Sequence, residues 1–269
     1  AQKVDAVGKP TGEHIPLVSF NDTDKDGKPV TLEISIGDAI ARMKELPAQY
    51  GNLFEGGKTF YGSIRFNYND SGTADNNVYI DSYGTGRATI DAEIGSGFTA
   101  SDCEYLSIKN LNFIGDGRLT GNTGNGMSFS YCSNIVVDSV NLSGFQHSGL
   151  TAKNIGKNYR FTNIYAHDNG YAGIFISGID KTSLSDIYIG YCIADDNAGD
   201  PTVLDNHSGN GIFLYNASNT ILEFCEASNN GWDMPRKGNG PGGIWVAEVD
   251  NVIIQHCIAH DNKTSVGGQ

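Results

Sequence analysis

The sequence lacks long apolar runs, an excess of positive charge and an even number of cysteines, and each absence argues against one class of protein. It has no apolar run long enough to cross a bilayer, so we expect no membrane span. Its 18 Lys and Arg against 31 Asp and Glu give a net charge of −13, which argues against nucleic acid as a partner. Its five cysteines, an odd number, suit free thiols better than a disulfide framework.

No signal peptide is visible at the start of the sequence. The chain begins Ala-Gln-Lys without a methionine, as a processed exported protein does. From this start we expect a secreted, cell-surface or periplasmic protein.

The negative net charge does not exclude a polyanionic sugar as a partner, because an acidic chain can bind one through a local basic cluster.

Glycine is abundant where proline is scarce, with 35 residues against seven. Asn, Asp, Ser and Thr accompany it, together with β-branched and aromatic residues. This mixture predicts many short strands joined by tight turns.

A phrase of similar residues recurs along the chain. A glycine before an apolar residue opens each unit, and two further strands follow, the last closed by an Asn. The opening pairs are Gly97-Phe98, Gly126-Met127, Gly149-Leu150, Gly173-Ile174, Gly211-Ile212 and Gly243-Ile244. The closing residues are Asn169, Asn197, Asn230 and Asn262. Units of this kind bury their apolar faces by stacking into a solenoid.

Stacking predicts columns of like residues about 4.8 Å apart. Cys192, Cys225 and Cys257 would form an inward column of small, soft side chains. The closing Asn residues would form another column, at a turn where Asn tolerates the left-handed conformation and where side-chain amides bond along the stack.

On these repeats the chain resembles the right-handed parallel β-helix proteins of the pectate-lyase-like superfamily, over roughly residues 55 to 269. The resemblance implies an all-β solenoid of three-strand coils and a polysaccharide partner. Another β-solenoid is the alternative, whereas a leucine-rich repeat would need a regular Leu spacing that is absent. The signatures of pectate lyases, polygalacturonases and alginate epimerases are not matched, so the resemblance transfers no catalytic residue.

The N-terminal part, residues 1–54, is expected to hold strands and a short capping α-helix. Residues 36–46 carry apolar side chains at helical spacing, and Pro47 ends the pattern. Such a helix would cover the open edge of the first coil. At the other end, residues 265–269 resemble the start of another coil, so we expect either that the natural protein continues or that a partner covers this edge.

The segment from Asp22 to Glu33 matches the calcium-loop spacing D-x-D-x-D-G-x5-E. Asp22, Asp24, Asp26 and Glu33 would supply the oxygen ligands, so Ca²⁺ is the metal this segment fits, although no cofactor is required. The flanks, however, read as strands, and the alternative is a solvated acidic hairpin turning at Asp26-Gly27.

Outward positions of the first strand in each unit carry the residues expected to bind sugar. Aromatic rings and a lysine there would provide stacking and hydrogen bonds. The substrate-binding set is Phe175, Phe213, Tyr215, Trp245 and Lys153 on these strands, together with Trp232 from the loop 231–242. The alternative is that the long loops 198–210 and 231–242 fold over these rings and bury them.

Those two loops also hold the catalytic candidates, namely Asp205, His207, Asp233, Arg236 and Lys237. Asp205 and Asp233 could serve as acid and base of a glycoside hydrolase. A cation or His207 could instead neutralise a uronate and abstract its α-proton, as a lyase or epimerase requires. We therefore predict a protein that binds and cleaves or modifies a polysaccharide, with a non-catalytic adhesin or structural solenoid as the alternative.

Overall fold

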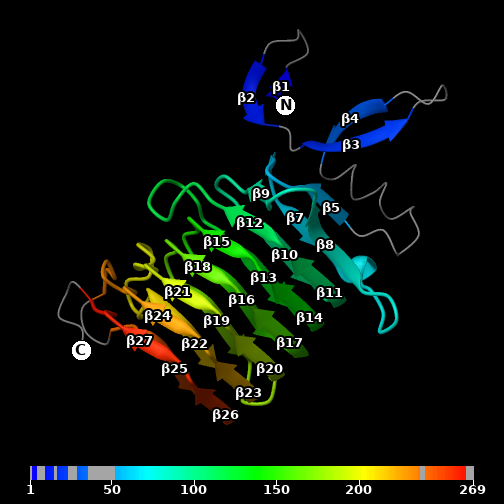
Figure 1. Ribbon diagram of the computed structural model, residues 1–269. Helices are drawn as coiled ribbons and strands as arrows, with labels where there is room; N and C mark the ends of the chain where they lie inside the picture. The colour runs from blue at the N-terminus through cyan, green and yellow to red at the C-terminus, as the bar shows by residue number, and fades with distance from the viewer. Residues whose placement is uncertain are drawn as a thin grey trace.

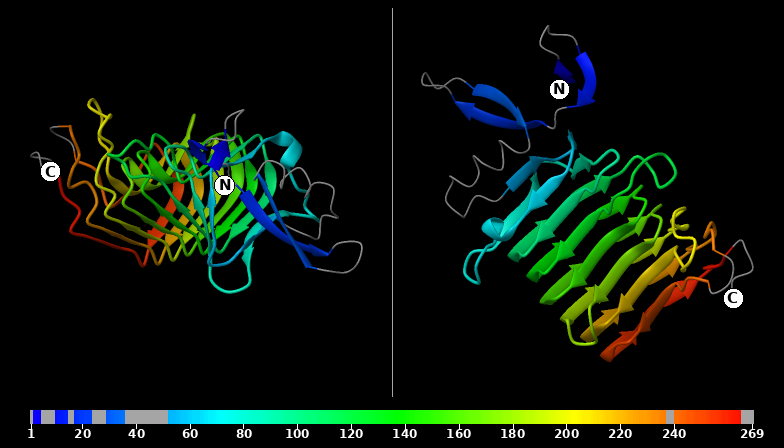
Figure 2. Two further views of the ribbon diagram at one scale, coloured as in Figure 1. Left: turned by 90° about the horizontal axis from the view of Figure 1, so that it is seen from above. Right: turned by 180° about the vertical axis from the view of Figure 1, so that it is seen from behind.

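The computed structural model describes residues 52–236 and 240–264 in full, together with the backbone of four N-terminal strands. Residues 52–264 wind into successive coils, each of which contributes one strand to each of three parallel sheets (Figure 1). Seen from behind, the coils follow one another in chain order along a single axis (Figure 2). The predicted all-β solenoid of three-strand coils is therefore confirmed.

The first sheet has seven strands, and the second and third have eight each. The first contains β7 (Ile64–Phe66), β10 (Phe98–Ser101), β13 (Met127–Ser130), β16 (Ser148–Asn154), β19 (Ala172–Gly178), β22 (Asn210–Tyr215) and β25 (Ile244–Ala247). The second contains β5 (Asn52–Glu55), β8 (Val78–Tyr83), β11 (Glu104–Lys109), β14 (Ser133–Asp138), β17 (Gly156–Thr162), β20 (Leu184–Gly190), β23 (Ala217–Glu223) and β26 (Asp250–Gln255). The third contains β6 (Thr59–Tyr61), β9 (Ala88–Asp91), β12 (Leu111–Ile114), β15 (Asn141–Ser143), β18 (Tyr165–His167), β21 (Ile193–Asp195), β24 (Glu226–Ser228) and β27 (Ile258–His260). One 3₁₀ turn, η1 (Tyr68–Asp70), interrupts the first described coil.

Two antiparallel pairs precede the coils. β1 (Gln2–Val4) pairs with β2 (Pro10–His14), and β3 (Leu17–Thr23) pairs with β4 (Pro29–Ser35). The expected capping helix over 36–46 lies outside the described residues, as do residues 265–269. Among the described residues, no helix combines the length and apolar character that crossing a membrane requires.

In-register pairing of the coils builds the predicted core columns. Cys192 and Cys225 are buried, and Cys257 packs partly buried against the same core. Each thiol of this column donates to a backbone carbonyl of the preceding coil. At another corner, Cys103 and Cys132 are likewise buried free thiols, so the described cysteines form two columns and no disulfide.

The closing Asn residues form the predicted ladder in the interior. The Nδ2 of Asn169 donates to Oδ1 of Asn197 at 3.0 Å, and the same bond links Asn197 to Asn230 at 2.9 Å and Asn230 to Asn262 at 2.8 Å. Each Nδ2 also donates to a backbone carbonyl, as that of Asn197 does to Ala166 at 3.1 Å. The ladder therefore satisfies polar groups that would otherwise be buried without partners at this turn.

The prediction that the ladder Asn residues themselves adopt the left-handed conformation is wrong. The residue before each of them does so instead: Asp168, Asp196, Asn229 and Asp261 have φ of 55°, 54°, 52° and 53°. Asp and Asn are the non-glycine residues that accept this region most readily. The preceding residue makes the turn, which leaves the Asn side chain free to point inward.

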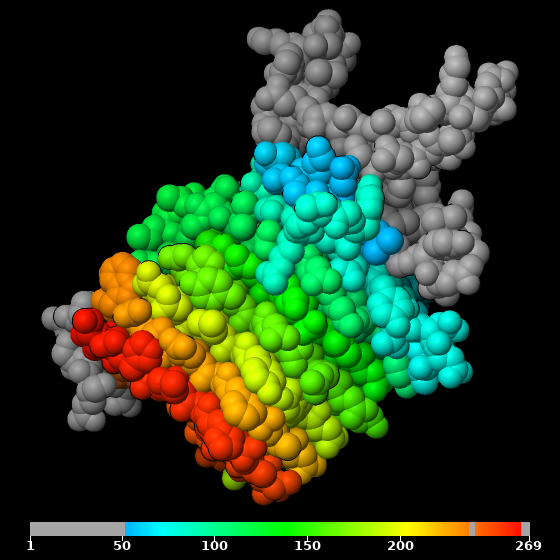
Figure 3. Space-filling view, viewed as in Figure 1, coloured from blue at the N-terminus to red at the C-terminus, as the bar shows by residue number. Residues whose placement is uncertain are grey.

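The recurrent glycine is required by close packing of neighbouring coils. A Cβ on Gly211 would lie 2.2 Å from the carbonyl oxygen of Gly243 and 2.7 Å from Cβ of Ala227. A Cβ on Gly126 would likewise lie 2.4 Å from the carbonyl oxygen of Gly149. The space-filling view shows the coils as closely packed successive bands, consistent with this approach (Figure 3).

Replacing Asn197 with Ala should lower the free energy of unfolding by about 3 kcal/mol, because it leaves buried polar groups of Asn169 without their acceptor. Urea denaturation measures the change. Asn112→Ala is the control, since its side chain bonds one hydroxyl at 3.3 Å at a partly buried site. Equal losses in the two variants would contradict a stabilising role for the ladder.

Candidate functional site

The turns between a third-sheet strand and the next first-sheet strand carry the polar side chains of the site. We call them the site turns: residues 115–126, 144–147, 168–171, 196–209, 229–236 and 240–243. Because the coils stack in register, these turns follow one another along one edge of the solenoid (Figure 2). The two long turns contain the segments in which catalytic residues were predicted.

A histidine and a carboxylate from different site turns form the best-ordered polar contact at this edge. Nδ1 of His147 lies 2.7 Å from Oδ2 of Asp200. The Asp200 side chain has no solvent exposure, whereas the His147 side chain is 44% exposed. The imidazole is therefore oriented by a buried carboxylate while part of the ring faces solvent.

Other donors satisfy the second oxygen of Asp200. Oδ1 accepts from Nε2 of Gln146 at 3.1 Å, from the backbone N–H of Thr202 at 2.9 Å and from its Oγ1 at 2.7 Å. Burial raises the pKa of Asp200, but the hydrogen bonds from His147, Thr202 and Gln146 outweigh it and bring the pKa to about 2. Asp200 is thus a carboxylate at neutral pH, and Nδ1–H is the tautomer that it favours in a neutral His147.

The loop that carries Asp200 folds back over earlier coils. A Cβ on Gly170 would lie 1.9 Å from the carbonyl oxygen of Gln146 in the preceding coil and 3.2 Å from Cα of Asp200, so glycine is required here mainly by the preceding coil, and the Asp200 loop also packs closely against it. Further along the loop, the backbone N–H groups of Gly209 and Asn210 both donate to the carbonyl of Tyr171 at 2.9 Å. This path brings Asp200 to a histidine 53 residues earlier in the chain.

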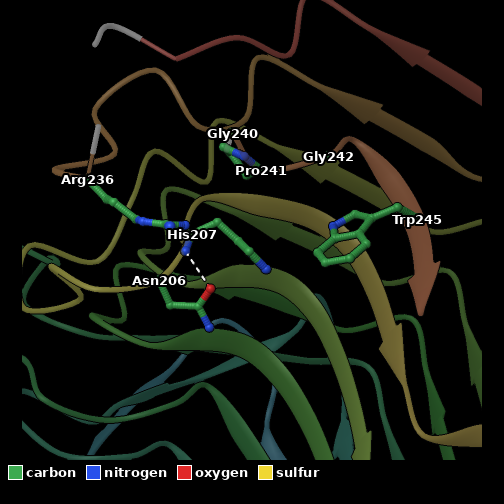
Figure 4. Close-up of a pocket in the computed structure, with 7 residues that line it drawn as sticks. All are labelled: Asn206, His207, Arg236, Gly240, Pro241, Gly242 and Trp245. Atoms are coloured by element: carbon green, nitrogen blue, oxygen red, sulfur yellow. Dashed lines mark hydrogen bonds between the residues drawn. The ribbon is translucent and has the colours of Figure 1, made fainter. Parts of the chain in front are cut away.

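A pocket of about 610 Å³ opens beside the last two strands of the first sheet. It is lined by Asn206, His207, Arg236, Gly240, Pro241, Gly242 and Trp245 (Figure 4). The indole of Trp245 forms an apolar wall, and Arg236 and His207 extend from the two long site turns (Figure 4). The volume is that of an ordinary small-molecule or sugar subsite.

His207 connects this pocket to the aromatic column of the first sheet. Its ring packs edge-on against Phe213 at 5.6 Å and Trp245 at 4.8 Å between centroids. Burial, together with the charge of Arg236, lowers the pKa of His207, although a hydrogen bond with Asn210 opposes the shift. The imidazole is therefore neutral at neutral pH, and its Nδ1 is buried without a hydrogen-bond partner among the described residues.

The outward aromatic column exists, but its rings stack mainly on one another. The ring centroids of Phe213 and Trp245 lie 3.7 Å apart, with an angle of 8° between the ring planes. Those of Phe213 and Phe175 lie 5.1 Å apart, with an angle of 22°. Phe213 is only 5% exposed, because it is stacked between Trp245 and Phe175 and His207 packs edge-on against it. The 196–209 turn thus packs on this ring and also lines the pocket beside Trp245, while sugar binding by the column stays a prediction.

The remaining predicted residues are dispersed. Tyr215 and Lys153 are exposed on the first sheet, and Asp205 is exposed on its loop. Nε1 of Trp232 donates to Asp196, and Asp233 accepts from Arg118 at 2.5 Å. The pairing of Asp205 with Asp233 as acid and base stays a prediction, and Lys237 lies outside the described residues.

The calcium segment is flanked by the antiparallel strands β3 and β4, with Thr23 opposite Pro29. This pairing is the hairpin arrangement considered for the sequence. Asp24 and Asp26 lie outside the described residues, and the side chains of Asp22 and Glu33 are not described, so calcium binding stays a prediction. Among the residues whose side chains are described, no group of three or more His, Cys, Asp or Glu could hold a metal.

The His147–Asp200 contact is not apparent from the sequence pattern, because the two residues are 53 positions apart and lie in turns of different coils. A usable signal was the run Asp200-Pro-Thr202, because an Asp followed two residues later by Thr often forms a local turn that fixes its carboxylate.

The low pKa of Asp200 predicts a pH-dependent contribution to stability. A carboxyl whose pKa falls from about 3.8 to about 2 on folding stabilises the protein by about 2 kcal/mol above the unfolded pKa, and this contribution is lost as the pH falls through the folded pKa. Urea denaturation between pH 6 and pH ~2 should show this loss in the wild type and not in Asp200→Asn. Parallel stability profiles for the two proteins would contradict the assignment.

Several solved structures are similar to this chain. The enzymatically active domain of tailspike protein 2 from bacteriophage CBA120 has 13% identity and a TM-score of 0.46, over 81% of this chain and 39% of that one. A double mutant of the periplasmic alginate epimerase AlgG has 13% identity and a TM-score of 0.43, over 79% of this chain and 61% of that one. An alginate lyase from Paenibacillus sp. has 14% identity and a TM-score of 0.38, over 86% of this chain and 94% of that one.

This chain thus spans 39% and 61% of the lengths of the first two structures. A search of the curated proteins finds no match. The family model described as "Right handed beta helix region" matches residues 89–268, well over half of the sequence. The chain belongs to this family of right-handed β-helix proteins.

Proposed function

We propose that this chain binds an acidic polysaccharide along its site turns and modifies or cleaves it by proton transfer, with His147 as the general base. The observation that carries the proposal is the half-exposed imidazole of His147 held through Nδ1 by the buried carboxylate of Asp200. With Nδ1–H bonded to Asp200, Nε2 keeps a lone pair that can accept a proton from substrate. Asp200 also stabilises the imidazolium that forms.

The nearby pocket supports an acidic substrate. Arg236 can neutralise a sugar carboxylate, Asn206 can donate hydrogen bonds to hydroxyls, and Trp245 supplies an apolar wall. Ser148, next to His147, stands in register with Ala172 and Asn210, so the pocket residues Asn206 and His207 lie two coils after the base, and Arg236 and Trp245 lie three coils after it. At about 4.8 Å per coil the separation is about 10 to 14 Å, which one oligosaccharide can bridge with Arg236 on the carboxylate of a neighbouring uronate.

Proton abstraction is favoured over two-carboxylate hydrolysis for a specific reason. A glycosidase needs a pair of carboxyl groups across the scissile bond. Asp233 is bound to Arg118, and Asp205 is exposed, whereas an oriented imidazole and an arginine are present at the same edge. In a lyase, removal of the α-proton at C5 of a uronate is followed by cleavage of the C4–O bond, which forms a C4=C5 double bond and a leaving oxygen that takes up a proton from the imidazolium or from water. In an epimerase, a proton returns to the opposite face of C5 and inverts that centre.

The first test is a screen of alginate, polygalacturonate and neutral glycans. Absorbance of an unsaturated product detects a lyase, and exchange of the α-proton with D₂O, followed by NMR, detects an epimerase. His147→Gln should lower kcat at least 100-fold with KM nearly unchanged, because the base is lost and the pocket remains. Wild-type kcat in this variant would exclude His147 as the base, and binding without turnover on every glycan would favour the non-catalytic alternative.

The pocket is tested separately by binding. Trp245→Ala should raise the Kd for an acidic oligosaccharide about tenfold, because it removes the apolar wall and lets His207 move. Tyr191→Ala is the matched control, since this ring is exposed at the corner between the second and third sheets. Isothermal titration calorimetry measures both affinities, and an unchanged Kd in Trp245→Ala would remove the pocket from the site.

A further inference from the structure

Arg118 joins site turns that are far apart in the sequence. Its Nη1 donates to the carbonyl oxygen of Gly199 at 3.0 Å, 81 residues later, and its Nη2 donates to Oδ2 of Asp233 at 2.5 Å, 115 residues later. The guanidinium also lies over the ring of Trp232, with 5.6 Å to the centroid. The Arg118 side chain is only 11% exposed, although its partner Asp233 is 47% exposed, so the guanidinium is enclosed between turns while the carboxylate faces solvent in part.

The bond to Gly199 acts on the peptide unit that leads into Asp200. The carbonyl of Gly199 and the N–H of Asp200 belong to the same planar peptide. Arg118 holds the carbonyl end, and Oγ of Ser208 accepts from the N–H end at 3.0 Å. With both ends fixed, the direction in which the Asp200 side chain leaves the backbone is also fixed.

Gly199 lies where the two loops that Arg118 contacts meet. Gly199 has φ of +138°, a conformation that L side chains rarely adopt. The neighbouring loop is anchored by the N–H of Asp233, which donates to the carbonyl of Ala198 at 2.9 Å. Arg118 therefore binds both a backbone carbonyl of the Asp200 loop and the carboxylate of the loop behind it.

We propose that Arg118 is a positioning residue that fixes the Gly199–Asp200 peptide and so holds the Asp200 carboxylate against Nδ1 of His147. The structural part of this proposal stands on the contacts alone, and its catalytic consequence rests on the proposed function. Arg118 touches no substrate in this scheme. It acts on proton transfer only through Asp200.

The structural part is tested by the titration of Asp200, followed through its side-chain carboxyl carbon by NMR. In Arg118→Ala the pKa should rise from about 2 toward the ordinary value of 3.8, because the bonds from His147 and Gln146 weaken when the loop moves. Arg118→Lys should restore part of the shift, since a lysine can still donate to the Gly199 carbonyl. Arg160→Ala is the matched control, because Arg160 stacks on Tyr188 from the second sheet and should leave Asp200 unchanged.

An unchanged Asp200 titration in Arg118→Ala would overturn the proposal. If that variant does not fold, Arg118→Lys and Arg118→Gln carry the test, and a titration equal to wild type in both would overturn it equally. This measurement needs no substrate, so its result does not depend on whether the protein turns over any glycan.

The catalytic part has its own readout. Arg118→Ala should lower kcat at least tenfold with KM unchanged, and the double variant with His147→Gln should be no slower than His147→Gln alone. Multiplicative losses in the double variant would show that Arg118 acts by a route that does not pass through the His147–Asp200 pair. A rise in KM alone would make Arg118 a substrate contact and contradict the positioning role.

Discussion

The structure depends on registration between coils. Parallel strands of neighbouring coils pair position by position, so every inward side chain meets its counterpart in the next coil. The buried Asn ladder enforces this registration at one corner, because each amide can bond the next only when the coils are aligned. A shift of one residue would turn the core columns outward and break the ladder at the same time.

Registration also explains where the candidate site lies. All turns that follow the third-sheet strands emerge along one edge, and a long turn can therefore reach those of earlier coils. The 196–209 turn does so: it brings Asp200 to His147 and exposes the Gly199 carbonyl to Arg118. The scaffold supplies rigid, regularly spaced anchors, and the irregular turns supply the chemistry.

The repeating parts of the structure could be predicted from the sequence because they rest on short-range pattern. The glycine-apolar pairs, the Cys192 column and the Asn ladder all lie where the repeat placed them. The left-handed conformation was predicted for Asn169, whereas Asp168, one residue earlier, adopts it. Asp and Asn both tolerate positive φ, so the sequence does not distinguish the two positions, and only the inward amide bonds of Asn169 do. The functional contacts could not be predicted, because they join turns 53 to 115 residues apart through loops without periodicity.

Burial of Phe213 shows the same limit. Strand alternation places its ring outward, yet stacking between Trp245 and Phe175 and an edge contact from His207, which lies on an irregular loop, bury it. The site thus combines a neutral, enclosed imidazole at the pocket with a more open one bonded to a buried carboxylate. These two environments give the two histidines different chemistry on one edge of the solenoid.

The central claim is that a buried carboxylate orients His147 for proton transfer. Long-range ¹H–¹⁵N correlation NMR on the imidazole rings reports which ring nitrogen of His147 carries the proton when the ring is neutral. The account predicts a proton on Nδ1, facing Asp200, and an unprotonated Nε2. A proton on Nε2, or the averaged signals of a freely exchanging imidazole, would contradict it.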